Sequence, residues 1–459
     1  MSEKTNILWL ITDQQTAGAM SCTGNEWLKT PGMDSVAERG IRFDRAYCTY
    51  PLCTPSRGSL LTGQYPHQID CNSNSMGKGG RFFWYRDFPR ESLLTNHLAK
   101  HGYRCVWSGK DMPPEDGSCG VELLSPWGDV QVGDKLTEFL KGPHDEPFLA
   151  IGALVNPHNI CEWTRQCTCM EGDVGDPPPL ADLPPLPPNH DFTQYEPEII
   201  RILQNDASYA FDPRGVTEEE WRQYVWAYYR MVEMADMQVK RILDGLDEAG
   251  LTDNTLVIFT GDHGDGCAAH RWNQKMVLYE EIIRIPLLLA GPGIESGRVD
   301  TSHLVSNGLD LFPTICEAAG LPVPGQVEGQ SLLPLCSDGA ASVDWRDEVV
   351  VETALNAEKG GGNPLRNSGR ALVRADMKYS VYTWGRHKEQ LVDLSTDPGE
   401  MTNLAADPAN KGTVLQMRQA LQDWCERTGD FFQVPGYEMM SPEGGWAELA
   451  EIRSESGGN

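Results

Sequence analysis

One short segment of the chain combines a cysteine with a fixed positive charge. The segment from Pro51 to Gly63 reads Pro-Leu-Cys-Thr-Pro-Ser-Arg-Gly-Ser-Leu-Leu-Thr-Gly, a helix-compatible run that a glycine closes. Arg57 follows Cys53 by four residues, a spacing that brings two side chains together on one face of a helix. Because a neighbouring cation favours a thiolate, this spacing predicts a nucleophilic Cys53. The alternative is a cysteine that serves as a small buried apolar side chain.

Three apolar runs each end in polar residues that could do chemistry. They span residues 6–12, 148–155 and 255–260, and each has the length of a strand buried on both faces of a parallel sheet. The polar residues that follow them are Asp13 and Gln14, His158, and Asp262 with His263. Because ligands bind beside the carboxyl ends of such strands, these side chains are candidates for one shared site. The alternatives are a helix cap for Asp13 and a loop cap for His158.

Together these motifs resemble those of the type I sulfatases, which belong to the alkaline-phosphatase-like superfamily. Cys-x-Pro-Ser-Arg followed by Gly-Ser-Leu-Leu-Thr-Gly matches the family signature without a break. The resemblance implies that a formylglycine-generating enzyme oxidises Cys53 to formylglycine, whose hydrated aldehyde is the nucleophile. It also implies that Asp13, Gln14, Asp262 and His263, with the modified Cys53, hold one divalent metal ion. Ligation rich in oxygen favours calcium, magnesium or manganese, and the imidazole favours manganese over calcium.

The resemblance assigns roles to further residues. Gly109-Lys110 resembles the second sulfatase signature, in which the lysine contacts the sulfate, and His158 corresponds to the histidine that faces the leaving-group oxygen. His270 and Lys275 follow the Asp-His-Gly motif at the family's spacing and are therefore candidate catalytic residues. The family usually has a histidine where this chain has Met112, so the second half-reaction lacks an assigned base.

These motifs predict a metal-dependent sulfatase that hydrolyses a small sulfate monoester, such as a sulfated sugar, choline sulfate or an aryl sulfate. As the family mechanism implies, Arg57, Lys110 and Lys275 would offset the charge of the transferring group, and His158 would protonate the departing alcohol. The Asp13-Gln14 pair also resembles the choline-sulfatase and phosphonate-monoester-hydrolase branches. Hydrolysis of a phosphonate monoester or a phosphodiester at the same site is therefore an alternative. A catalytically silent metal-binding relative is another, although the intact cysteine motif argues against it.

The elements that must position these residues predict an α/β fold. Strands alternate with helices over residues 1–341, which predicts a large, mostly parallel sheet between helices, with the alkaline-phosphatase-like arrangement that the resemblance implies. The clearest helix spans Thr217 to Ala249, with Thr217 as its cap. Shorter segments from about residue 342 to 459 predict a smaller C-terminal domain with an antiparallel sheet and a long helix over residues 410–428.

Two loops are candidates for the substrate pocket. Residues 176–189 are too rich in proline for a helix or a central strand, and they are expected to form an extended wall at the mouth of the site. A second loop, residues 71–86, carries the aromatic run from Phe82 to Tyr85. These rings could stack on a sugar or enclose a quaternary ammonium group, or they could anchor the loop.

The composition limits the partners and the compartment. A net charge of −28 argues against nucleic acid and anionic membranes as partners, so positive charge must be concentrated locally if the substrate is an anion. Thirteen irregularly spaced cysteines, no visible signal peptide and no membrane-length apolar run predict a cytoplasmic enzyme, with a homo-oligomer possible. The cluster of Cys161, Cys167 and Cys169 lacks the paired spacing of a zinc site, so incidental cysteines are favoured.

Overall fold

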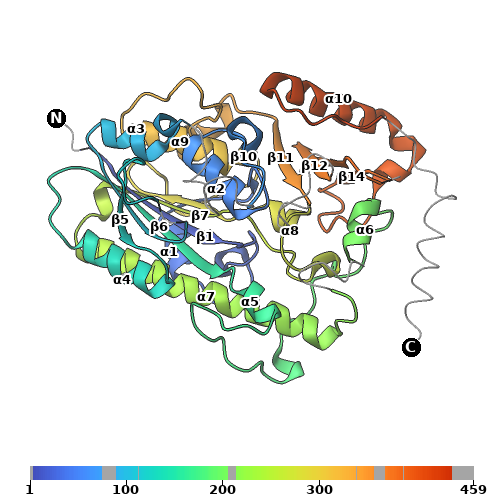
Figure 1. Cartoon of the computed structure of the whole chain (residues 1–459), viewed down its shortest axis with the longest axis horizontal. Helices are drawn as coiled ribbons and strands as arrows, with labels where there is room; N and C mark the ends of the chain where they lie inside the picture. The colour runs from blue at the N-terminus through green and yellow to red at the C-terminus, as the bar shows by residue number, and fades with distance from the viewer. Residues whose placement is uncertain are drawn as a thin grey trace.

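The computed structural model describes residues 4–74, 89–111, 113–204, 213–337, 339–355, 367–385 and 387–436. An eight-stranded sheet with the order β5-β4-β6-β1-β7-β8-β2-β9 runs through the centre of this part of the chain (Figure 1). Its strands are β1 (Asn6–Asp13), β2 (Gly40–Phe43), β4 (Arg104–Gly109), β5 (Glu122–Ser125), β6 (Phe148–Pro157), β7 (Thr255–Gly261), β8 (Leu287–Ala290) and β9 (Arg298–Asp300). Neighbouring strands are parallel except where β8 pairs with β7 and β2, so the predicted mostly parallel sheet is confirmed.

The central strand β1 explains why its sequence is apolar without interruption. Ile7, Trp9 and Ile11 pack into the core on one face of the sheet, whereas Leu8 and Leu10 pack into the core on the other. All five side chains are buried. A strand covered on both faces has no polar face, and this leaves a run of apolar residues in place of an alternating pattern.

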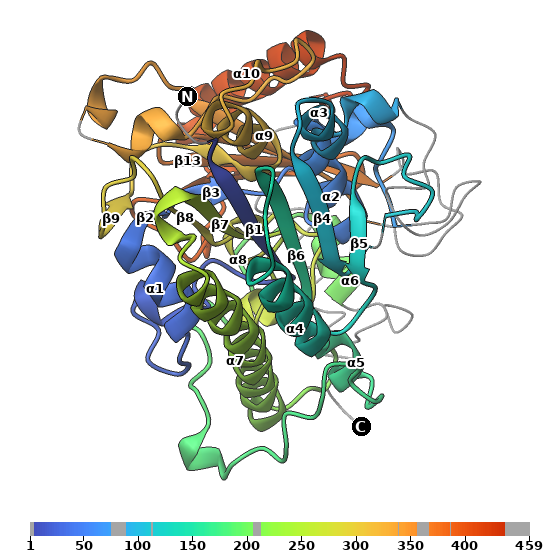
Figure 2. The same cartoon turned by 90° about the vertical axis from the view of Figure 1, so that its left-hand side faces the viewer.

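Helices form a layer on each face of the sheet, as Figure 1 and Figure 2 show. One layer contains α1 (Pro31–Arg39), α4 (Asp129–Leu140), α5 (Ile160–Thr164) and α7 (Glu218–Glu248), and the other contains α2 (Cys53–Thr62), α3 (Leu94–Lys100) and α9 (Asn307–Ala318). Thr217 caps α7 as predicted. Its hydroxyl accepts a hydrogen bond from the Glu220 N–H at 3.2 Å, and the Glu220 carboxylate accepts one from the Thr217 N–H at 2.7 Å. This reciprocal pair is a capping box.

The C-terminal part is a four-stranded antiparallel sheet with a helix on its outer face. The sheet contains β11 (Glu348–Ala354), β12 (Ser368–Arg374), β13 (Met377–Tyr382) and β14 (Glu389–Asp393), and α10 (Lys411–Thr428) covers it. Both elements were predicted. Val349 and Val351 of β11 pack into the core beneath the large sheet, whereas Val350 faces α10. The C-terminal sheet therefore shares a core with the main sheet, and the domain boundary near residue 342 stays a prediction.

Several smaller features complete the fold. The remaining elements are the short paired strands β3 (Ala46–Tyr47) and β10 (Val305–Ser306), and the short helices α6 (Glu198–Gln204) and α8 (Glu280–Ile283). The proline-rich segment is an extended loop with one 3-10 turn, and Arg222 of α7 donates hydrogen bonds to three carbonyls within residues 180–184. No helix in the described residues is both long enough and apolar enough to span a membrane. Met112, the run Phe82–Tyr85 and residues 437–459 lie outside the described residues.

Candidate active site

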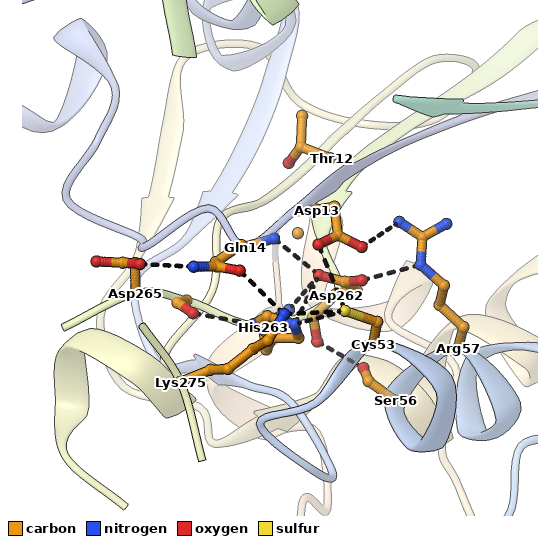
Figure 3. Close-up of polar contacts among 12 residues, drawn as sticks. Thr12, Asp13, Gln14, Cys53, Ser56, Arg57, Asp262, His263, Asp265 and Lys275 are labelled. Carbon is orange, nitrogen blue, oxygen red and sulfur yellow. Dashed lines mark hydrogen bonds and ion pairs between the residues drawn. The ribbon is translucent and has the colours of Figure 1, made fainter. Parts of the chain in front are cut away.

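The site lies where four parallel strands end beside the start of a helix. β4, β6, β1 and β7 are consecutive in the sheet, so their carboxyl ends lie along one edge. Asp13 is the last residue of β1, Lys110 follows β4, His158 follows β6 and Asp262 follows β7. The helix α2 begins at Cys53, and the Cys53 side chain points into this edge of the sheet, as Figure 3 shows. The fold thus brings together residues that are widely separated in sequence.

Four buried side chains form a cluster with the composition of a metal site. Potential ligand atoms of Asp13, Cys53, Asp262 and His263 all lie within 4.8 Å of one another. His263 Nδ1 lies 2.9 Å from the Gly264 carbonyl oxygen, which can only accept, so Nδ1 carries the hydrogen and Nε2 presents a lone pair. Burial lowers the pKa of His263, which keeps the imidazole neutral. Two carboxylates and a neutral imidazole form a donor set that suits a divalent cation.

Gln14 lies next to this cluster, with its amide fixed at both ends. Its Nε2 donates hydrogen bonds to Asp265 at 2.7 Å and to Gln274 at 3.1 Å. Its Oε1 accepts a hydrogen bond from Lys275 Nζ at 3.0 Å, and that ammonium group lies 3.2 Å from Cys53 Sγ (Figure 3). The carbonyl oxygen, which is the atom expected to bind the metal, is therefore the end turned toward Lys275 and Cys53.

The helical spacing predicts that Arg57 stabilises a Cys53 thiolate, but Arg57 pairs with carboxylates instead. Its guanidinium group pairs with Asp262 at 2.9 Å, with Asp13 at 3.1 Å and with Asp111 at 3.1 Å, and it is buried among these carboxylates. Burial and the charge of Asp13 raise the pKa of the Cys53 thiol to about 11. The prediction of a bare thiolate stabilised by Arg57 is therefore wrong, because the arginine balances the acidic residues of the cluster and the buried thiol stays neutral.

Two lysines supply the positive charge closest to Cys53. Lys110 Nζ lies 2.6 Å from Asp13 Oδ2 and 3.8 Å from Cys53 Sγ, and Lys275 Nζ lies 3.2 Å from Sγ. Although burial opposes it, the charges of Lys110 and Arg57 hold the pKa of Asp13 well below its usual range. This is the local concentration of positive charge that an anionic substrate requires in a strongly acidic chain.

The two histidines that were predicted as catalytic residues differ in their relation to the cluster. Burial and the charges of Lys110 and Lys275 lower the pKa of the half-buried His158, as expected for an imidazole beside the site. In contrast, His270 stacks on Tyr279 with ring centroids 3.7 Å apart and hydrogen-bonds Thr193, and burial lowers its pKa to about 3. Among the described residues, the His270 side chain contacts Tyr279, Thr193, Asn189 and Glu281 and none of the four residues of the cluster, so no contact supports a catalytic role for His270.

Sequence reasoning missed three residues that contact the site. Asp111 directly follows Lys110 and pairs with Arg57, and its backbone adopts a left-handed conformation with φ 59°. Gln274, next to Lys275, accepts a hydrogen bond from Cys161 Sγ at 2.8 Å, which gives this cysteine a structural role. The third residue, Asp265, accepts a hydrogen bond from Gln14 Nε2 at 2.7 Å, and its position directly after the Asp-His-Gly motif was the available signal.

Comparisons with known proteins agree with this geometry. The chain matches the family model described as Sulfatase over residues 5–321, and the model described as N-sulphoglucosamine sulphohydrolase, C-terminal, over residues 268–427. A Delta 4,5-hexuronate-2-O-sulfatase of Bacteroides thetaiotaomicron is 31% identical over 94% of this chain and 91% of its own length. The solved structure of a 2-O GAG sulfatase has a TM-score of 0.81 at 28% identity and covers 95% of both chains. The phosphonate monoester hydrolase of Agrobacterium radiobacter has a TM-score of 0.74 at 20% identity, with 96% of this chain and 99% of its own covered, and so shares the fold.

Proposed function

The chain belongs to the sulfatase family, and on this premise we propose that it is a metal- and formylglycine-dependent enzyme that hydrolyses the sulfate monoester of a small sugar. One observation carries the proposal. Cys53 Sγ lies 3.3 Å from His263 Nε2, 3.5 Å from Asp13 Oδ1, 3.2 Å from Lys275 Nζ and 3.8 Å from Lys110 Nζ. A nucleophile at this position would be surrounded by metal ligands and by cations that can hold a sulfate group.

The state of the thiol supports its modification. A thiol with a pKa near 11 is almost entirely protonated at neutral pH and is a poor nucleophile. Conversion of Cys53 to formylglycine by a generating enzyme would replace it with a hydrated aldehyde, whose hydroxyl can attack sulfur. The proposal therefore explains why a cysteine without thiolate character stands at the centre of the site.

The proposed metal is one calcium or manganese ion held by Asp13, Gln14, Asp262 and His263 with the modified residue. When bound, such an ion supplies Lewis acidity toward the sulfate and the nucleophile. Arg57 balances the two carboxylates of this set, and it holds them in place through hydrogen bonds of 2.9 and 3.1 Å.

The remaining side chains act on the substrate. The ammonium groups of Lys110 and Lys275 flank the nucleophile, where they can balance the charge of the transferring sulfate. His158 is neutral in the free protein because burial lowers its pKa, and the negative charge of a bound ester would favour its protonated form. Protonated His158 can then donate its proton to the departing alcohol.

The substrate class is proposed from the relatives. The Delta 4,5-hexuronate-2-O-sulfatase covers nearly the whole chain at 31% identity, so a 2-O-sulfated unsaturated hexuronate is the first candidate. Other small sugar sulfates and choline sulfate follow it. Each carries one small anionic sulfate group, in agreement with a site whose positive charge is confined to a few buried residues.

The test combines mass spectrometry with kinetics. The Cys53 peptide is first examined for the aldehyde after expression with a formylglycine-generating enzyme. Modified protein is then stripped with EDTA, reconstituted with calcium or manganese, and assayed on 2-O-sulfated Delta 4,5-hexuronate, choline sulfate, an aryl sulfate and an aryl phosphonate ester. We expect metal-dependent turnover of a sulfate ester and preference for the sugar. Preference for the phosphonate ester would keep the site but refute the substrate class, and an unmodified Cys53 with full activity would refute the mechanism.

A further inference from the structure

We infer that Asp265 and Gln274 are positioning residues that fix the amide of Gln14 so that its oxygen, and not its nitrogen, faces the metal-ligand cluster. The inference rests on the proposed function, in which Gln14 is a metal ligand. Only the oxygen of an amide can bind a hard cation, because the nitrogen presents two hydrogens and no lone pair. A glutamine ligand therefore needs neighbouring groups that distinguish the oxygen of its amide from the nitrogen. An aspartate at the same position would not need them, because both atoms of its carboxylate are oxygens.

The two hydrogens of Gln14 Nε2 are both accounted for. One is directed to Asp265 Oδ2 at 2.7 Å and the other to Gln274 Oε1 at 3.1 Å. Both partners are acceptors. If the amide were flipped, its oxygen would lie against the Asp265 carboxylate and would meet no donor there, while the nitrogen would face the Lys275 ammonium group. The flipped arrangement is thus disfavoured at both ends.

The acceptors are themselves held in place. The Tyr224 hydroxyl donates to Asp265 with an O–O distance of 2.9 Å, and the Cys267 N–H donates to the same carboxylate at 2.7 Å. Cys161 Sγ lies 2.8 Å from Gln274 Oε1 and 3.6 Å from Gln14 Oε1, and its thiol can donate its one hydrogen to the nearer oxygen. Asp265, Gln274, Tyr224 and Cys161 are all at most 3% exposed, so bulk water does not reach these groups to replace a lost partner.

The backbone of Gln14 is fixed by the same neighbourhood. Its carbonyl accepts a hydrogen bond from the Tyr228 hydroxyl at 2.8 Å, and its N–H donates to Asp262 Oδ1 at 3.0 Å. The residue adopts a left-handed conformation with φ 69°. A backbone held in this unfavourable region, with a side chain bonded at both ends, has little freedom to present any atom other than Oε1. In Figure 3, Asp265 lies to the left of Gln14, on the side away from Cys53.

The first test measures metal binding directly. Manganese is titrated into EDTA-treated Asp265→Asn protein and followed by calorimetry and by the electron paramagnetic resonance signal of free Mn²⁺. We expect an affinity about 10- to 100-fold weaker than that of the wild type, the loss typical of a residue that orients a ligand. Asp236→Asn is the matched control, because Asp236 is an equally buried carboxylate that hydrogen-bonds α1 and should leave manganese affinity unchanged. Thermal unfolding of the metal-free proteins checks that each variant is folded.

The second test separates orientation from general loosening of the site. Gln14→Glu has an oxygen at both ends of its side-chain head group and needs no orientation, but it faces the Asp265 carboxylate. Asp265→Asn should therefore weaken manganese binding when residue 14 is Gln and strengthen it when residue 14 is Glu. A purely structural role would weaken binding in both backgrounds and would overturn the inference, as would unchanged affinity in Asp265→Asn. Unchanged affinity in Gln14→Ala would instead refute the ligand role on which the proposed function relies, and the inference with it.

Discussion

The pair formed by Lys110 and Asp13 offers the sharpest test of the site's electrostatics. The ammonium nitrogen and the carboxylate oxygen are 2.6 Å apart, and both side chains are buried. At an effective dielectric constant of about 20, this separation corresponds to a gross attraction of about 6 kcal/mol. Lys110→Met preserves the length of the side chain and removes the charge. It leaves Asp13 with Arg57 as its remaining ion-pair partner among the described residues.

Removing one member of a buried pair costs about 3–5 kcal/mol, because the partner remains buried with its charge uncompensated. Since Arg57 still pairs with Asp13 at 3.1 Å, we expect the lower end of this range, about 3 kcal/mol. Turnover should also fall by about 10²- to 10³-fold, the usual effect of removing one group that stabilises charge in a transition state. Urea unfolding of the EDTA-treated protein measures the loss in the free energy of unfolding. Because the metal ion has been removed, it cannot offset the missing lysine charge.

The difference in stability between the wild type and Lys110→Met should depend on pH. In the wild type the folded pKa of Asp13 lies below its unfolded value, so its contribution to stability is present above the unfolded pKa and is lost as the pH falls through the folded pKa. In Lys110→Met the carboxylate loses a cation that lowers its pKa, and protonation in acid relieves the uncompensated charge. The stability deficit should therefore be largest near pH 7–8 and shrink toward acid pH.

A matched control is available on the surface. Lys135 pairs with Glu138 at 2.7 Å, but both side chains are about half exposed or more. Lys135→Met is the same substitution at nearly the same distance, and an exposed pair contributes about 0–1 kcal/mol. If Lys110→Met were as stable and as active as Lys135→Met, the buried pair would not hold Asp13 as the structure indicates, and the electrostatic reasoning would be refuted.

Three further outcomes are expected. Cys53→Ala should keep the circular-dichroism melting curve of the wild type and lose all measurable turnover; residual catalysis in pure protein would contradict the proposed nucleophile. Because burial and neighbouring lysines lower the pKa of His158, its protonated fraction rises as pH falls, so kcat/KM on a sugar sulfate should increase from pH 8 to pH 6. His158→Gln should abolish this increase and cost about 10²- to 10⁴-fold, with a smaller loss on 4-nitrophenyl sulfate, whose leaving group needs no proton; equal losses on both esters would argue against an acid role. Asp236→Ala should reduce the free energy of unfolding by about 2–4 kcal/mol in urea, because the Gly32 and Met33 N–H groups that it binds at 2.9 and 2.7 Å would lose their acceptor.

Local pattern was sufficient for most of the fold. The apolar run before Asp13 indicated a strand buried on both faces, and the structure places it at the centre of the sheet. Thr217 and the helical spacing after it defined α7 to within one residue at each end. These predictions succeeded because burial on both faces of a strand leaves an unbroken apolar run in the sequence, and burial along one stripe of a helix leaves a helical period.

The sequence also determined which residues gather at the site. Asp13, His158 and Asp262 each follow an apolar run, and Lys110 was indicated by its resemblance to the second sulfatase signature. All four follow or end parallel strands, whose carboxyl ends lie along one edge of the sheet. The segment around Cys53 indicated a helix closed by a glycine, and α2 begins at Cys53 and ends before Gly63. The position of each residue after its strand was enough here, because parallel strands bring their carboxyl ends to the same edge of the sheet.

Only the tertiary structure decided what each side chain contacts. Helical spacing put Arg57 on the same face of α2 as Cys53, but two carboxylates from β1 and from the end of β7 attract its guanidinium group more strongly than a neutral thiol does. His270 kept its family spacing, yet its ring stacks on Tyr279. The orientation of the Gln14 amide depends on partners about 250 residues away. Spacing defines the face from which a side chain projects, whereas its partner and its charge depend on which distant groups share the same buried volume.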